Sequence, residues 1–435
     1  MPTSLLPEAQ EHWVEGDALA LPIPANAEAL RAGGAEWLTS AFHAMGSLTP
    51  ENCVTAITRC DSFEAGGTGT KALLSLSYAR PEEGLPADLF VKFSRNFANS
   101  EMDRAKFHMG PEIRFAALSR TPGFPVAVPR CLFADYAEAS GTGLLITERI
   151  GFGQNGIERQ YGKCLDHLLP QPLEHYRALI RTLARLAGSH MGGRLPATVA
   201  DEFAFDLGKA LAADRLTCTG QQRVNRVARY AEFAAEHPQL LPEAIRSEAF
   251  IARFGEGFAL FQAQQDAIKR YLHAQGDLIA LCHWNANSDN AWYWRDAGGE
   301  LQCGLLDWGS VGQMHVAMTL WGCLSSAEQW LWQGHLDELL ALFVAEYAAA
   351  GGPALDPAEL RQHLLLYAAM MGLCWLLDAP PRIRREVPAL ADATGPLDPL
   401  ILASETARVQ LQMMTNFLML WVREDATGVL ARLFG

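Results

Sequence analysis

The sequence lacks the features that mark several common classes of protein. Lys and Arg number 35 against 49 Asp and Glu, so the formal net charge is −14 over 435 residues. Such an acidic chain lacks the basic footprint expected of a general nucleic-acid-binding protein. The nine cysteines include no C-x-x-C pair, and we expect reduced thiols rather than a disulfide framework. No H-E-x-x-H sequence or zinc-type Cys/His cluster is present.

Long hydrophobic runs are also missing. The longest, such as residues 364–377, fall short of the roughly 20 residues that cross a bilayer. The first residues carry acids and no basic run before an apolar core, which is unlike a signal peptide. We therefore expect a cytoplasmic protein with neither a nucleic-acid nor a membrane partner, and no oligomeric state is predicted. An apolar content of 49% suffices for a large buried core.

The periodic patterns divide the chain into a strand-rich part and a helical part. Residues 25–45 have the composition and apolar spacing of a helix. Strand patterns follow at residues 54–63, 73–78, 89–93, 131–136 and 144–150, with a helix pattern at 111–118. From about residue 174 helical patterning dominates, apart from two short strand-like segments at 278–282 and 301–306. This order predicts an α+β fold rather than a regular βαβ alternation.

A glycine-rich connector lies between the first two strand patterns and contains Gly66, Gly67 and Gly69. Glycines tolerate positive φ and let a backbone approach phosphates closely. The spacing Gly67-x-Gly69-x-x-Ala72 fits a dinucleotide fingerprint, but that motif requires a helix directly after it and a strand pattern follows here. No glycine precedes Lys71, so the segment is not a Walker A loop. Both an ordinary hairpin and a phosphate-binding loop stay open.

Lys92 and Glu112 form a second candidate pair. Lys92 lies inside the apolar strand pattern at residues 89–93, where a lysine either extends its ammonium past the strand or is held there for a purpose. Glu112 opens the helix that follows, a position that the helix dipole also favours for an acid. In phosphoryl transfer, a strand lysine paired with a helix glutamate is held against the nucleotide phosphates. We expect an ion pair between the two.

The most specific pattern is LCHWNANSDN at residues 281–290, followed by LLDWG at 305–309. It resembles the H-G-D-x-x-x-x-N catalytic loop and the metal-binding D-[FW]-[GE] element of aminoglycoside phosphotransferases and choline kinases. His283, Asn290 and Asp307 occupy the matching positions. The resemblance covers roughly residues 54–325 and includes Lys92, Glu112 and the glycine-rich loop. Residues 144–150, which include Glu148, are similar to the strand and linker that carry the adenine-binding hinge of these kinases.

The resemblance implies a two-lobed, protein-kinase-like fold. Residues 1–52 would be a helical prefix. Residues 53–150 would form a small nucleotide-binding lobe with a five-stranded antiparallel sheet and one helix, and residues 151–435 a large helical substrate and catalytic lobe. It further implies that Mg²⁺ is held by Asn290 and Asp307. ATP would be bound by Gly66, Gly67, Gly69, Lys92, Glu112 and Glu148.

The sequence departs from the family at the catalytic position, where Asn285 replaces the aspartate and Trp284 the preceding glycine. An amide cannot act as a general base, although its carbonyl oxygen can accept a hydrogen bond from a hydroxyl. General-base catalysis contributes about 10² to 10⁴ in rate, whereas positioning and metal electrostatics dominate phosphoryl transfer. Asp289 is either a substitute base, a ligand of a second cation or a surface acid.

We therefore expect an ATP-dependent phosphotransferase that acts on a hydroxyl of a small molecule and is atypical at its catalytic base. Two alternatives stay open. One is a pseudokinase-like module that binds nucleotide without turnover. The other is a kinase-fold enzyme that transfers a nucleotidyl group. The sequence does not predict the acceptor.

Overall fold

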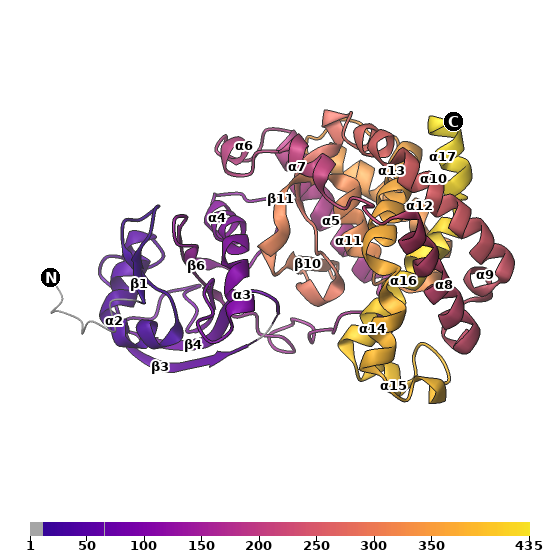
Figure 1. The fold of residues 1–435 in the computed structure, drawn as a ribbon. Helices are drawn as coiled ribbons and strands as arrows, with labels where there is room; N and C mark the ends of the chain where they lie inside the picture. The colour runs from indigo at the N-terminus through magenta and orange to yellow at the C-terminus, as the bar shows by residue number, and fades with distance from the viewer. Residues whose placement is uncertain (1–11, 65) are drawn as a thin grey trace. The chain divides into compact units, whose positions relative to one another are not determined.

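The computed structural model describes residues 12–64 and 66–435. The chain divides into two compact units. The first unit contains the described residues up to Asn155 together with Pro196–Phe203 and Gly304–Val311, and the second contains Gly156–Leu195, Ala204–Cys303 and Gly312–Gly435. In Figure 1, where colour follows residue number, the strands up to residue 155 are indigo to purple.

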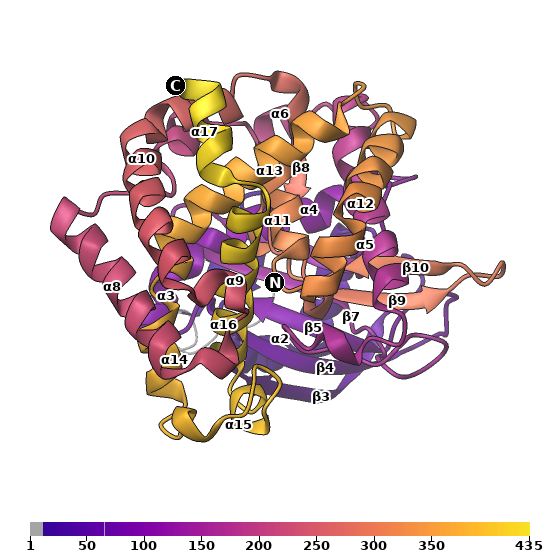
Figure 2. The same ribbon diagram turned by 90° about the vertical axis from the view of Figure 1, so that its right-hand side faces the viewer.

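The first unit is built on a five-stranded antiparallel sheet of order β3-β4-β5-β7-β6. Figure 2 shows four of these strands, β3, β4, β5 and β7, side by side. The five strands are β3 (Val54–Phe63), β4 (Thr70–Tyr78), β5 (Asp88–Phe93), β6 (Cys131–Ala137) and β7 (Thr142–Glu148). The predicted five-stranded antiparallel sheet is confirmed.

The segment ahead of the sheet packs onto it. The expected helix is present as α2 (Ala27–Ala44), whose N-cap Asn26 accepts a hydrogen bond from the Ala29 amide. Two short paired strands, β1 (Trp13–Glu15) and β2 (Pro22–Pro24), precede it. Side chains of α2 share one buried apolar cluster with the sheet strands: Leu30, Leu38, Phe42, Leu74, Val91, Leu144 and Ile146. Each such side chain stabilises the fold by about 1.5 to 3 kcal/mol when fully buried, so this segment is part of the first unit's core.

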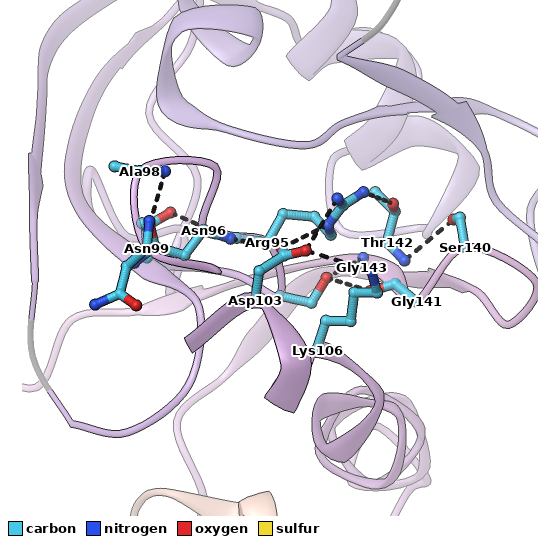
Figure 3. A network of polar contacts seen from close by, with 12 residues as sticks. Arg95, Asn96, Ala98, Asn99, Asp103, Lys106, Ser140, Gly141, Thr142 and Gly143 are labelled. Carbon is cyan, nitrogen blue, oxygen red and sulfur yellow. Dashed lines mark hydrogen bonds and ion pairs between the residues drawn. The ribbon is translucent and has the colours of Figure 1, made fainter. Parts of the chain in front are cut away.

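A polar network holds the chain where β5 ends (Figure 3). Arg95 donates from Nε to Asp103 Oδ1 at 2.8 Å and from Nη1 to Thr142 Oγ1 at 3.4 Å. Burial by itself would raise the pKa of Asp103, but hydrogen bonds from Arg95 and from the Asn96 amide outweigh it and bring the pKa to about 2. These charge-assisted bonds tie the end of β5 to the β6–β7 hairpin and to α3 (Ser100–Arg104).

Two further elements follow α3 in the first unit. The 3₁₀ turn η1 (Ala105–Met109) leads into α4 (Gly110–Leu118), which has a proline in its first turn as the sequence predicts. The short helix α6 (Val199–Glu202) also belongs to this unit.

The second unit is largely helical. Its helices are α5 (Pro172–Met191), α7 (Leu207–Ala212), α8 (Gly220–Glu236), α9 (Glu243–Arg246), α10 (Glu248–Leu272), α11 (Val316–Leu324), α12 (Gln329–Ala349), α13 (Pro357–Met371), α14 (Ala379–Glu386), α15 (Pro399–Leu402), α16 (Glu405–Arg423) and α17 (Ala426–Phe434). Helices α5 and α12 approach closely, since a β-carbon at Gly188 would lie 2.3 Å from the Tyr347 carbonyl oxygen.

Two short strand pairs interrupt these helices. One joins β8 (Ile279–His283) and β11 (Val311–His315), and the other joins β9 (Ala291–Arg295) and β10 (Leu301–Leu305). Strands β8 and β10 fall at the two short segments that the sequence predicts. With an antiparallel sheet in one unit and helices in the other, the predicted α+β class is confirmed.

Across the described residues, no single helix combines the length and the apolar composition needed to cross a membrane. One bent pair, Pro357–Leu376 with Ala379–Glu386, meets that criterion by length and composition with a 50° bend. Most apolar side chains of α13, within this pair, are buried.

Candidate functional site

Lys92 is the centre of a charged cluster in the first unit. Its Nζ donates to Glu112 Oε1 at 2.6 Å and to Asp307 Oδ1 at 2.8 Å. The predicted ion pair between Lys92 and Glu112 is therefore present. Burial by itself lowers the pKa of Lys92, but the two carboxylates outweigh burial and raise it, so the ammonium stays charged.

The pleat of β5 explains where Lys92 points. Leu89, Val91 and Phe93 are buried in the core. Because successive side chains of a strand alternate between its faces, Phe90 and Lys92 project from the other face. This alternation places the Lys92 ammonium away from the apolar cluster and toward Glu112 of α4.

Asp307 reaches this cluster from a distant part of the sequence. It has a left-handed backbone (φ 57°) and precedes the 3₁₀ turn η6 (Trp308–Ser310); aspartate is among the residues that tolerate this conformation. Trp308 stacks on Phe115 of α4 with ring centroids 3.9 Å apart, and the Leu305 amide donates to the Ala127 carbonyl. These contacts fix the segment, while the Asp307 side chain stays 52% exposed.

The glycine-rich loop joins β3 to β4 as a hairpin. Gly66 and Gly69 have positive φ (66° and 57°). A β-carbon at Gly69 would lie 1.9 Å from the Phe93 carbonyl oxygen, whereas one at Gly67 would have no atom within 4 Å. Glycine is therefore required at position 69, where the loop passes directly against the end of β5. Lys71 follows at once and its Nζ donates to the Thr68 carbonyl.

Glu148 is the last residue of β7. Its Oε1 accepts a hydrogen bond from the Arg130 amide at 2.8 Å, just ahead of β6. This contact holds the two chain segments together at the end of β7, where the sequence predicts the adenine-binding hinge.

In the second unit, the loop after β8 is anchored by neighbouring helices. His283 is fully buried and its carbonyl accepts from Thr319 Oγ1 at 2.6 Å. A β-carbon at Gly322 of α11 would lie 1.6 Å from the Trp284 carbonyl oxygen, so that helix lies directly against the loop. Trp284, which replaces the expected glycine, donates from Nε1 to the Tyr367 hydroxyl of α13 at 3.0 Å. The loop thus accommodates the indole by tying it to a helix.

Asn285 is held by a residue that the sequence did not single out. Its Oδ1 accepts from Lys163 Nζ at 2.9 Å and from Asn287 Nδ2 at 3.1 Å. Its backbone carbonyl accepts from Asn290 Nδ2 at 2.8 Å, and this bond does not use the amide oxygen of Asn290. The structure therefore places an ammonium at the amide of Asn285, where the sequence resemblance implies a catalytic aspartate.

The buried carboxyl of Asp166 accepts a hydrogen bond from the same loop. Asp289 lies half-buried on the 3₁₀ turn η5 (Ser288–Asn290). The neighbouring Ser288 hydroxyl donates to Asp166, which is fully buried. Burial, with a smaller contribution from the charge on Asp289, raises the pKa of Asp166 to about 7. No local pattern marks Lys163 or Asp166, because both lie in an aperiodic segment more than 100 residues before the loop.

The predicted ligands have the chemistry that Mg²⁺ prefers, a carboxylate on Asp307 and an amide oxygen on Asn290. Within the described part of the chain, no group of three or more His, Cys, Asp or Glu could hold a metal ion. Mg²⁺ suits such a sparse donor set, since it is commonly bound through one or two carboxylates plus the phosphates of a nucleotide. The donor chemistry therefore fits a metal that arrives with its nucleotide.

The chain is similar to known proteins in structure and not in sequence. No protein-family model matches it, and no curated protein matches its sequence. Similar solved structures include a choline/ethanolamine kinase family protein from Mesorhizobium loti, at 14% identity and TM-score 0.43, covering 93% of this chain and 98% of that one.

Two other similar structures have comparable scores. A choline kinase from Cryptosporidium parvum has 10% identity and a TM-score of 0.44, covering 87% and 94% of the two chains. An aminoglycoside phosphotransferase from Streptomyces rimosus has 18% identity and a TM-score of 0.35, covering 71% and 91%. The chain thus resembles solved members of the group that its motifs predict.

Proposed function

We propose that this protein is an ATP- and Mg²⁺-dependent phosphotransferase that acts on a hydroxyl of a small molecule. The observation that carries the proposal is the position of Lys92 between Glu112 and Asp307, at 2.6 and 2.8 Å. A mostly buried lysine that bridges a buried helix glutamate and a half-exposed aspartate is the arrangement that phosphoryl transfer requires for holding phosphates beside a metal.

Each residue of the first unit has a distinct role in this proposal. Lys92 binds phosphate oxygens, and Glu112 fixes the lysine through their ion pair. The backbone of Gly66, Gly67 and Gly69 covers the phosphates, and Glu148 lies at the adenine hinge. Asp307, with Asn290, would hold Mg²⁺, which supplies neutralisation of charge on the phosphates when bound.

On the acceptor side, Asn285 orients the hydroxyl by donating to its oxygen from Nδ2, and Asp289 takes its proton. The acceptor oxygen forms a bond to the γ-phosphorus, and the bond from that phosphorus to the oxygen of ADP breaks. Asn285 cannot accept the proton itself, because an amide is not a base and its carbonyl oxygen already accepts hydrogen bonds from Lys163 and Asn287. Asp289 lies four residues further along the same loop, and its carboxylate is the group that we assign as the base.

The test is product analysis with purified protein, ATP and Mg²⁺ across a panel of small hydroxylated molecules. Release of ADP together with a phosphorylated acceptor supports the proposal. Asn285 itself favours the alternative of a nucleotide-binding module, which would bind ATP and release neither product. Pyrophosphate release would instead identify nucleotidyl transfer, and either result would replace the proposed activity.

A further inference from the structure

Lys71 lies directly opposite Lys92 in the sheet. Strand β4 lies between β3 and β5 (Figure 2), and its register with β5 pairs Lys71 with Lys92. Side chains that are directly opposite in an antiparallel pair share one face, with Cβ atoms about 4.5 to 5.5 Å apart, and like charges there destabilise the sheet. Two ammonium groups therefore project from the same face of the first unit.

The two lysines differ in how their charges are balanced. Lys92 has two carboxylates within ion-pair distance, Glu112 and Asp307. Lys71 is only 8% exposed, yet no carboxylate among the described residues lies within 4.0 Å of its Nζ. Burial and the neighbouring charge of Lys92 lower the pKa of Lys71 more than the surrounding carboxylates of Asp307, Glu112 and Glu64 raise it. A buried cation is costly unless it is paired, so an anion in direct contact with Lys71 would stabilise it.

The ammonium of Lys71 also lies over the glycine-rich loop. Its Nζ donates to the Thr68 carbonyl, and a β-carbon at Gly66 would lie 3.8 Å from it. A lysine ammonium has three donor hydrogens, so this single backbone bond leaves further capacity for oxygen ligands. Gly66 has a positive φ, and it brings the loop backbone close to this ammonium with no side chain of its own in the way.

We propose that Lys71 is a second phosphate-binding lysine, which holds phosphate oxygens of the nucleotide from β4 while Lys92 holds others from β5. This inference rests on the proposed nucleotide site. A polyphosphate would bring an anion into direct contact with Lys71, relieve the repulsion between the two lysines and replace water around a buried ammonium. The ligand class is therefore a nucleoside di- or triphosphate rather than a nucleoside.

The experiment compares the affinities of ATP and adenosine by isothermal titration for wild-type protein and for Lys71→Met, Lys71→Gln and Lys71→Arg. Adenosine has the same base and sugar as ATP but no phosphate. Loss of one charge-assisted hydrogen bond weakens binding about tenfold or more. We expect the Met and Gln variants to weaken ATP by at least that factor and to leave adenosine unchanged, with Arg closer to wild type. Lys209→Met, at a side chain that is 88% exposed, is the matched control and should change neither affinity.

The contrary outcomes distinguish failure of the Lys71 inference from failure of the proposed function. Unchanged ATP affinity in both neutral variants overturns the inference alone. Equal weakening of ATP and adenosine also overturns it, because Lys71 would then only shape the loop through Thr68. If one neutral variant fails to fold by circular dichroism, the other decides; if both fail, Lys71 is a structural residue and the inference is overturned. Wild-type protein that binds neither ligand overturns the proposed function itself.

Discussion

At the scale of single residues, Lys163 changes what position 285 can do. Its ammonium lies 2.9 Å from Asn285 Oδ1, so a carboxylate introduced there would form an ion pair. An opposite charge at this distance lowers a carboxyl pKa by about 1 to 3 units and weakens it as a base. The environment of residue 285 therefore suits an amide.

This gives a prediction about the catalytic position. Asn285→Asp alone should raise ADP release with Mg²⁺ and ATP by less than about tenfold, because Lys163 binds the new carboxylate. The double variant Asn285→Asp with Lys163→Met should raise it tenfold or more, a modest part of what a general base supplies. Lys163→Met alone is the control for lost positive charge. Equal rates for the single and double variants would show that Lys163 does not restrain this position.

A second residue-scale prediction concerns Asp166. Its pKa is raised to about 7 from a usual 3.8, so the native state keeps a proton that the unfolded state loses between these values. Its contribution to stability is present at low pH and is lost as the pH rises through 7. Asp166→Asn cannot ionise, so relative to wild type it should gain stability between pH 5 and pH 8, on the order of 2 kcal/mol. Urea unfolding at both pH values measures this, and parallel pH profiles for the two proteins would contradict it.

At the scale of elements, the turn between β3 and β4 depends on one glycine. Gly69→Ala places a β-carbon 1.9 Å from the Phe93 carbonyl oxygen at a positive φ, where strain alone costs about 1 to 2 kcal/mol. We expect the free energy of unfolding to fall by at least about 2 kcal/mol. Gly67→Ala, with no atom within 4 Å of the new carbon and no positive φ, should stay within about 1 kcal/mol of wild type. If the two variants unfold alike in urea, the close approach at Gly69 is not what restricts this turn.

The elements show why sequence reasoning reached the sheet but missed part of the site. Strand β3 begins and ends at the residues that its strand-compatible composition predicts, Val54 and Phe63. For β4 the apolar run begins at Leu73 while the strand begins at Thr70, so Lys71 was assigned to the connector. Its position opposite Lys92 depends on the register of the β4–β5 pair, which neither strand encodes by itself.

Residues that act across long sequence separations were the hardest to predict. Asn290 and Asp307 could be predicted from a motif with a fixed local spacing, and Lys92 and Glu112 from the strand and helix patterns that contain them. Lys163 and Asp166 were not found, because their contacts to Asn285 and Ser288 span 122 residues each. Such contacts can be recognised only from the tertiary structure.

At the scale of the whole molecule, the first unit acquires Asp307 from far along the chain. Residues Gly304–Val311 belong to this unit although they are flanked in sequence by parts of the second. The contact between Lys92 and Asp307 therefore spans 215 residues. The net charge of −14 opposes the approach of a polyphosphate through long-range repulsion. The proposed binding of ATP therefore depends on local cations, and Lys92 and Lys71 are the ones we propose.

The central claim is that Asp307 beside Lys92 forms a metal and nucleotide site, and thermal unfolding with and without ATP and Mg²⁺ tests it most directly. Asp307→Asn is the informative variant, because asparagine tolerates the left-handed backbone and removes only the charge. Asp61→Asn, at a side chain that is 65% exposed, is the matched control.

A ligand present at 100 times its dissociation constant stabilises a protein by about 2.7 kcal/mol. We predict that Mg²⁺ increases stabilisation by ATP in wild-type protein and in Asp61→Asn, and that Asp307→Asn folds normally but loses the Mg²⁺-dependent part. An Asp307→Asn protein that ATP and Mg²⁺ stabilise as strongly as wild type would contradict the account.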